Sequence, residues 1–273
     1  MEFLQNVAGT LRFPGPGDDP VAFEANPTIT VTRHSDGSAI ATAAATSKVE
    51  EGDDVYFTFD LTGADLPEVD LLIAVWTADG SSYTTYTEVV GGFACSLKAI
   101  AKKYDEGGPS NDDFAAAREA ATTQIEGACG VAFRPRYGKE VLDGSGSREL
   151  LLRQPKLLRV LSVSVAGETV DPDGLTVDPL GVVLSPFRWA EGRSNVEIAY
   201  VHGYESYGPA GLPVCDLAAY LLTTSPTDWN QRATSVSTEK GSYSLVTPGV
   251  RGASFPLPVV NAFVEDNFWP SVG

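Results

Sequence analysis

The sequence has few of the residues that enzymes use for acid–base chemistry and metal binding. It contains only 2 histidines, His34 and His202, in 273 residues. His34 precedes an Asp-Gly turn and His202 ends a strand-like run, and a single histidine in such a place is usually structural or exposed. No Cys/His metal spacing, nucleophile elbow, phosphate-binding loop or dinucleotide fingerprint occurs. We therefore expect no enzymatic activity, no catalytic residue, no cofactor and no metal site.

Cysteines and long apolar runs are also scarce. Cys95, Cys129 and Cys215 are odd in number and far apart. They are expected to be reduced and mostly buried, as in a protein made in a reducing cytoplasm. No apolar run approaches the ~20 residues that cross a bilayer. The opening MEFLQNVAGTLRF lacks the basic start and apolar core of a signal peptide, so we expect a globular chain with no membrane partner.

Positive charge is scarce in the first third of the chain. Residues 1–92 hold 15 acidic and 3 basic side chains, a net of −12, whereas the other 181 residues hold 21 and 16, a net of −5. Residues 132–160 are locally basic, with 7 basic and 3 acidic side chains. This asymmetry predicts two modules in different surroundings. The overall net charge of −17 disfavours tight nucleic-acid binding as the main task.

Residues 1–92 have the pattern of an all-β module. After a polar lead-in over 1–20, short runs of β-branched and aromatic residues alternate with polar ones, and Asp-Gly or Gly-Asp pairs separate them. This spacing predicts a small antiparallel, Ig-like β-sandwich. The expected strands are 28–32, 55–61, 71–77 and 84–90.

A long helix is the clearest element after residue 92. Ser110 and Asp113 have capping-box spacing, and Gly130 is a typical helix stop. The apolar face is expected to consist of Phe114, Ala117, Ala121, Ile125 and Ala128. The basic segment FRPR follows, in which Pro135 keeps Arg134 extended.

The rest of the chain mixes strands and helices, so we predict an α+β protein with a second domain over 93–273. A short helix begins at Leu97, and a hairpin is expected around Gly144–Ser147. Later strands are expected at 161–165, 182–184 and 196–201, a helix from Pro213, an irregular segment over 224–240, a short strand at 243–245 and a helix over 256–268.

The order of these elements resembles one known family. The segments SLKAIAKKY, DDFAAAREAATTQIEGACGVAFRPR, KEVLDG, RVLSVSVAGETV, NVEIAYVHGYE, LPVCDLAAYLL and SYSLVT follow one another across roughly 96–268. Together they resemble the head-to-tail adaptor (head-tail connector) proteins of long-tailed bacteriophages. The module over about 9–92, ending EVVGGF, is similar to sandwich domains fused to such adaptors in some phages.

This resemblance implies a structural virion protein that catalyses no reaction. Family members form a ring, commonly twelve-fold, beneath the portal at one capsid vertex. The expected partners are therefore copies of the chain, the portal protein, the stopper or next neck protein, the major capsid protein through the N-terminal domain, and genomic DNA that passes non-specifically through the channel. The segment over about 241–273 would dock on the portal. The candidate interface residues are Arg134, Arg136, Tyr243, Leu245, Phe255, Val259, Phe263, Phe268 and Trp269.

Two other functions fit parts of the sequence. In the first, the chain is an Ig-like adhesin or carbohydrate-binding module in which exposed Trp76, Tyr83 and Tyr86 form a sugar platform. Burial preferences favour a core position for these aromatic side chains instead. In the second, the chain is a hydrolase that uses a pair of carboxylates, although the carboxylates of 1–92 fall mainly in turns and on expected outer faces.

Overall fold

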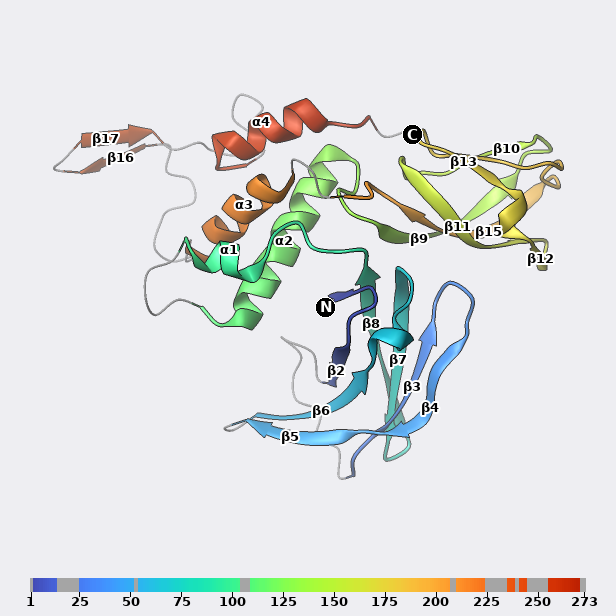
Figure 1. Ribbon diagram of the computed structural model, residues 1–273, viewed down its shortest axis with the longest axis horizontal. Helices are drawn as coiled ribbons and strands as arrows, with labels where there is room; N and C mark the ends of the chain where they lie inside the picture. Colours follow the sequence, from blue (N-terminus) through green and yellow to red (C-terminus); the bar gives the residue numbers. More distant parts are fainter. Residues whose placement is uncertain are drawn as a thin grey trace. The chain divides into compact units, whose positions relative to one another are not determined.

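The computed structural model describes residues 2–13, 25–51, 54–103, 109–206, 210–223, 235–238, 241–244 and 255–270. It is a mixed α and β structure (Figure 1). Its contacts divide it into two compact units: unit 1 is Met1–Gly92 with Pro135–Gly203, and unit 2 is Phe93–Arg134 with Tyr204–Gly273. The chain therefore changes unit at the boundary expected near residue 92. The domain expected over 93–273, however, is shared between both units, because its strands pack with the N-terminal module.

The N-terminal part of unit 1 consists of two β-sheets around one apolar core. One sheet has the order β1-β8-β7-β3-β4 and the other β2-β6-β5. Ile29, Phe57 and Trp76 come from both sheets and are among the buried core residues. The strands are β1 (Glu2–Leu4), β2 (Gly9–Phe13), β3 (Thr28–Arg33), β4 (Ala39–Ala45), β5 (Ser47–Glu51), β6 (Asp54–Leu61), β7 (Asp70–Ala78) and β8 (Ser81–Val90), with a 3-10 turn η1 (Gly63–Asp65).

The expected strands of this module are present, and further strands accompany them. β1 and β2 lie in the stretch expected to be a lead-in; Leu11 and Phe13 of β2 are buried, and β2 pairs with β6. The sequence pattern does not predict β2, because its apolar alternation is too short to stand out from the surrounding turn residues. The Asp79-Gly80 turn joins β7 to β8 with φ values of 52° and 74°, as a two-residue hairpin turn requires.

The second part of unit 1 also has two sheets, in the orders β12-β11-β15-β9 and β10-β14-β13. Val163, Trp189 and Ile198 are buried in their common core. The expected hairpin around Gly144–Ser147 is wrong. β9 pairs with β15 and β10 pairs with β14, which places Leu150 against Val183 in the interior. The elements are β9 (Arg136–Gly144), β10 (Glu149–Leu151), β11 (Leu157–Val165), β12 (Glu168–Val170), η2 (Pro172–Gly174), β13 (Thr176–Asp178), β14 (Val182–Leu184) and β15 (Gly192–His202).

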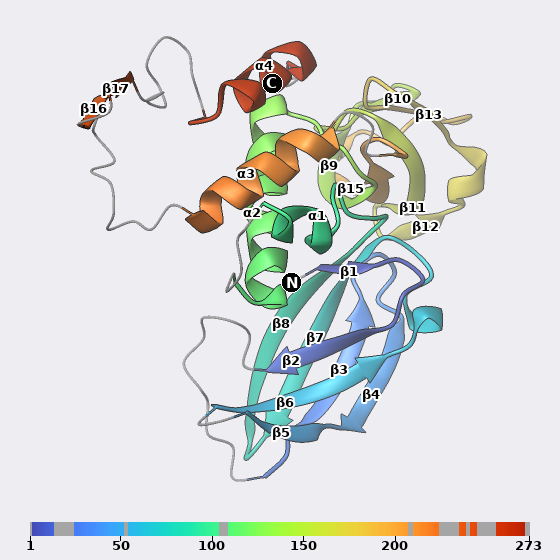
Figure 2. The same ribbon diagram turned by 60° about the vertical axis from the view of Figure 1, so that its left-hand side comes forward.

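Unit 2 is a cluster of helices (Figure 2) around a third apolar core. α2 packs against α1, α3 and α4. Ile100, Ile125, Ala218 and Val260 have no exposed surface. The helices are α1 (Leu97–Ala101), α2 (Asn111–Cys129), α3 (Gly211–Thr223) and α4 (Pro258–Asn267). β16 (Ser235–Thr238) lies in the segment expected to be irregular, and it pairs with β17 (Gly241–Ser244), which overlaps the strand expected at 243–245.

The ends of α2 confirm the sequence pattern. Ser110 accepts a hydrogen bond from the Asp113 amide, and the Asp113 carboxylate accepts one from the Ser110 amide at 2.9 Å. Gly130 ends the helix with φ of 70°. The predicted face is buried except at Ala128, which is only partly buried, and Cys129, four residues after Ile125, takes the interior position.

Candidate interaction surface

The C-terminal helix α4 packs on its own unit, and two of the predicted interface residues are buried there. Phe255 and Phe263 are buried, and the Phe263 ring lies 5.1 Å from that of Phe133. Asn261 fixes the entry to α4 because its side chain accepts from the Phe255 amide at 2.9 Å and donates to the Phe255 carbonyl at 2.7 Å. Phe255 and Phe263 therefore attach α4 to the core of unit 2.

The residues after α4 close over the end of α2. The Trp269 amide donates to the Cys129 carbonyl at 2.7 Å. The Trp269 carbonyl would lie 2.6 Å from a Cβ at Gly130, so that glycine is required both for its positive φ and for this close approach. Trp269 is half-buried, whereas Phe268 is 61% exposed and Val259 is 45% exposed. Of the predicted C-terminal anchors, Val259 and Phe268 lie on the surface.

Two other candidates come from the strand predicted near residue 243. Tyr243 lies in β17, where the structure defines the backbone pairing with Val236. Leu245 lies outside the described residues.

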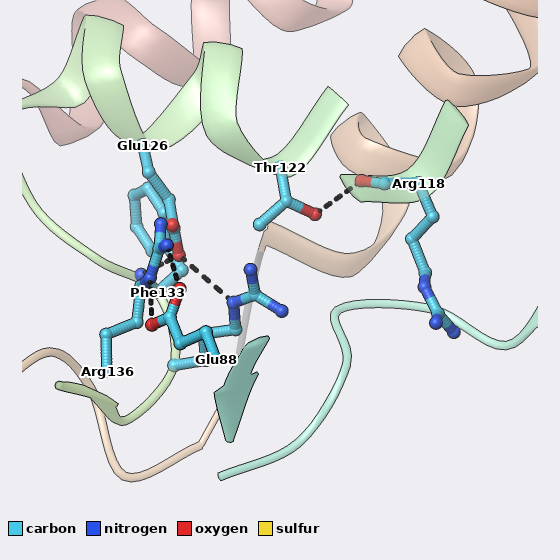
Figure 3. A network of polar contacts seen from close by, with 7 residues as sticks. Glu88, Arg118, Thr122, Glu126, Phe133 and Arg136 are labelled. Atoms are coloured by element: carbon cyan, nitrogen blue, oxygen red, sulfur yellow. Dashed lines mark hydrogen bonds and ion pairs between the residues drawn. The ribbon is translucent and has the colours of Figure 1, made fainter. Parts of the chain in front are cut away.

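Arg134 was expected on the surface, but it is 1% exposed. Its Nε lies 3.8 Å from Glu126 Oε1, and Glu126 also accepts a hydrogen bond from the Phe133 amide at 2.9 Å. Figure 3 shows the Glu126 side chain directed from α2 toward Phe133. The sequence misleads here because arginine is rarely buried unless it is paired, and the pairing depends on how the chain returns past α2.

Arg136 has a different partner within unit 1. Its Nε donates to Glu88 Oε1 at 2.8 Å, and a second guanidinium nitrogen contacts Glu88 Oε2 (Figure 3). This bidentate contact joins β9 to β8, and both side chains are largely shielded from solvent. A planar guanidinium suits such a bidentate contact with a carboxylate. Arg136 therefore connects the two parts of unit 1.

A cluster of polar side chains, which we call the sandwich joint, surrounds His34 between the two parts of unit 1. The Tyr137 hydroxyl lies 3.2 Å from His34 Nδ1, and Lys139 donates to the His34 carbonyl at 3.3 Å. Ser162 Oγ donates to the Ser35 carbonyl at 2.7 Å. Burial, followed by the charge of Lys139, lowers the pKa of His34. No short sequence pattern indicates this joint, because its members come from segments that are far apart in the chain.

Asp70 contacts the sandwich joint through Ser35, and the Asp70 residue is 2% exposed. Its carboxylate accepts hydrogen bonds from Ser35 Oγ at 2.5 Å and from the Ser35 amide at 3.1 Å. Burial raises the pKa of Asp70 and outweighs the opposing effect of these hydrogen bonds. The Ser35 hydroxyl is thus hydrogen-bonded to a carboxylate. A serine nucleophile is instead commonly activated by a histidine imidazole. The geometry supports a structural connection.

His202, the second histidine, is buried at the end of β15. Burial, followed by the charge of Arg136, lowers the pKa of His202 to about 4. No hydrogen-bond partner reaches His202 Nδ1 among the residues that the structure describes. The imidazole is therefore neutral near pH 7.

The aromatic residues of the sandwich do not form one exposed platform. Trp76 has no exposed surface, stacks on Phe13 at 5.5 Å and donates from Nε1 to Thr85 Oγ1 at 2.9 Å. Tyr83 lies beside the same Phe13 ring at 5.6 Å. Of the three candidate platform residues, Tyr83 is 37% exposed and Tyr86 is 61% exposed. The core position favoured by burial preferences is thus confirmed for Trp76.

Within the described part of the chain, no group of three or more His, Cys, Asp or Glu side chains is arranged to hold a metal ion. No helix among the described residues is both long enough and apolar enough to span a membrane.

Comparisons with known proteins add little to this geometry. No family model matches the sequence, and no curated protein matches it. A structure described as Bacteroides ovatus GH9 aligns with 68% of this chain at 12% identity and a TM-score of 0.24, and the match spans 26% of that protein. A chimeric titin Z1Z2-Z1Z2 tandem, functionalized with a GRGDS exogenous peptide from fibronectin, aligns with 74% of this chain at 10% identity and a TM-score of 0.24, over 91% of its own length. At these TM-scores neither likeness supports an argument about function.

Proposed function

We propose that this protein is a head-to-tail adaptor of a long-tailed bacteriophage, with an N-terminal Ig-like sandwich. It would form a ring, expected to be twelve-fold, that joins the portal to the stopper or tail and extends the DNA channel. The observation that carries the proposal is the order of elements after residue 92: α1, α2, the FRPR segment, the sheets of β9 to β15, α3, the β16–β17 pair and α4. This is the order that the resemblance implies.

The solvent face of α2 supports contact between copies. Ala116, Ala120, Thr123 and Gly127 are exposed and recur at spacings of three and four. Side chains at this spacing share one face of a helix, and small ones let a neighbouring backbone approach closely. A ring needs such a surface on each subunit and a complementary surface on the next.

The surface charge supports passage of DNA without tight binding. Residues 93–273, which would form the ring, hold 21 acidic and 16 basic side chains, a net of −5. A surface that held phosphates strongly would retain the genome, whereas an acidic one favours release. In this proposal Val259 and Phe268 meet the portal, and the acidic sandwich faces outward toward the capsid.

Mass photometry of the full chain, alone and with the portal protein of the same phage, tests the proposal. We expect a single large species whose mass is a multiple of the 28.9 kDa chain. Ala120→Arg should abolish it by placing a long cation on the small-residue face, whereas Thr169→Arg, at an exposed site on β12, should preserve it. A chain that stays monomeric at every concentration and ignores the portal would contradict the proposal.

A further inference from the structure

Two cysteines that are far apart in the sequence meet in unit 2. Cys95 lies just before Ser96, the N-cap residue of α1, and Cys215 lies in the first half of α3. Both are free thiols; Cys215 is a member of the apolar core and Cys95 packs against the same core. Each thiol is near enough to affect the pKa of the other.

The backbone fixes this proximity independently of the thiols. A Cβ placed on Gly211, the first residue of α3, would lie 2.9 Å from the Ala94 carbonyl oxygen. Cys215 is four residues further along α3, about one turn, and so lies on the same side of the helix as Gly211. Arg118 of α2 donates from Nη1 to the Cys95 carbonyl at 3.3 Å. The chain around Cys95 is therefore held against the start of α3.

We propose that Cys95 and Cys215 are a cross-linking site that closes to an intramolecular disulfide when the protein meets a small-molecule disulfide such as oxidised glutathione. The half-exposed Cys95 thiolate attacks one sulfur of the oxidant and releases the first glutathione thiolate. The Cys215 thiolate then attacks the Cys95 sulfur and releases the second. The two protein thiols are oxidised, two glutathione molecules are reduced, and the two thiol protons pass to them.

The cross-link would enclose a large part of the fold. The 119 residues between the two cysteines include α1, α2 and the whole Pro135–Gly203 part of unit 1. Closing so long a loop restricts the unfolded chain strongly. We therefore expect the oxidised protein to melt at a higher temperature than the reduced one. Cys129, which is buried at the end of α2, is left as a single thiol.

The environment makes the pair slow to react at neutral pH. Burial, followed by the neighbouring Cys215 thiol, raises the pKa of Cys95 to about 12, and burial also raises the pKa of Cys215. Because the thiolate is the nucleophile, its population and the initial rate should increase about tenfold for each pH unit between pH 7 and pH 9. The site would thus stay reduced in a reducing cytoplasm and close outside it.

Intact-mass spectrometry of the full chain after treatment with oxidised glutathione at pH 8.5 tests this. The expected product has lost two hydrogens, keeps one free thiol out of three and yields a Cys95–Cys215 peptide. Cys129→Ser should give the same cross-link, and Cys215→Ser should give only a glutathione adduct on Cys95. A wild-type protein that ends as the mixed disulfide, remains unreacted, or links Cys129 to either partner would overturn the proposal.

Discussion

Replacing Glu126 by glutamine should destabilise unit 2 strongly. Glu126 is 7% exposed and lies 3.8 Å from the Nε of Arg134, which is itself 1% exposed. Glutamine keeps the volume and an oxygen that can accept from the Phe133 amide, so the main change is loss of a negative charge beside a buried cation. Removing one member of a buried ion pair costs about 3–5 kcal/mol. The separation of 3.8 Å favours the lower end of that range.

Urea denaturation followed by circular dichroism at 222 nm measures this change, because the four described α-helices all lie in unit 2. Glu265→Gln on α4 is the matched control; Glu265 is exposed, and its change should stay within about 0.5 kcal/mol. The double variant Glu126→Gln/Arg134→Met should lose less than the two single variants together, because both charges are then gone. If Glu126→Gln unfolds at the same urea concentration as the wild type, the buried pair is not the stabilising contact described here.

Three further predictions address the helix cap, the sandwich core and the buried histidine. Ser110→Ala should lower the free energy of unfolding by about 1 kcal/mol through loss of the α2 cap, as measured by urea denaturation, and an unchanged midpoint would contradict this. Trp76→Ala should cost about 3–5 kcal/mol, whereas Tyr86→Ala should be nearly neutral; equal effects in thermal melts would refute the core assignment. As pH falls from about 6.5 to 4, the unfolded chain protonates His202 before the folded one does, so stability should fall, and His202→Phe should flatten this slope in melts across that range.

Local chemistry made the long helix and the main sandwich strands predictable. Ser110, Asp113 and Gly130 act within one or two turns of their own positions, so their roles can be assigned without knowing what packs against the helix. The alternation in β6 and β7 is equally local, because successive side chains of a strand point to opposite faces.

The contacts that organise unit 1 could not be predicted in this way. β9 pairs with β15 and not with its neighbour in sequence, and Arg136 contacts Glu88 48 residues away. Such pairings depend on which side chains the whole fold buries, and no local sequence pattern indicates them. The burial of three predicted interface residues is likewise decided by the whole fold: Arg134, Phe255 and Phe263 have residue types common at interfaces, but they are buried within this chain.

The proposed function requires this protein to assemble with copies of itself beneath a portal. Electron microscopy of the full chain mixed with the portal protein of the same phage tests this most directly. The account predicts top views with rotational symmetry in which one layer of density belongs to this chain, and loss of that layer with Ala120→Arg. Portal particles without added density, beside free monomers of this chain, would contradict it.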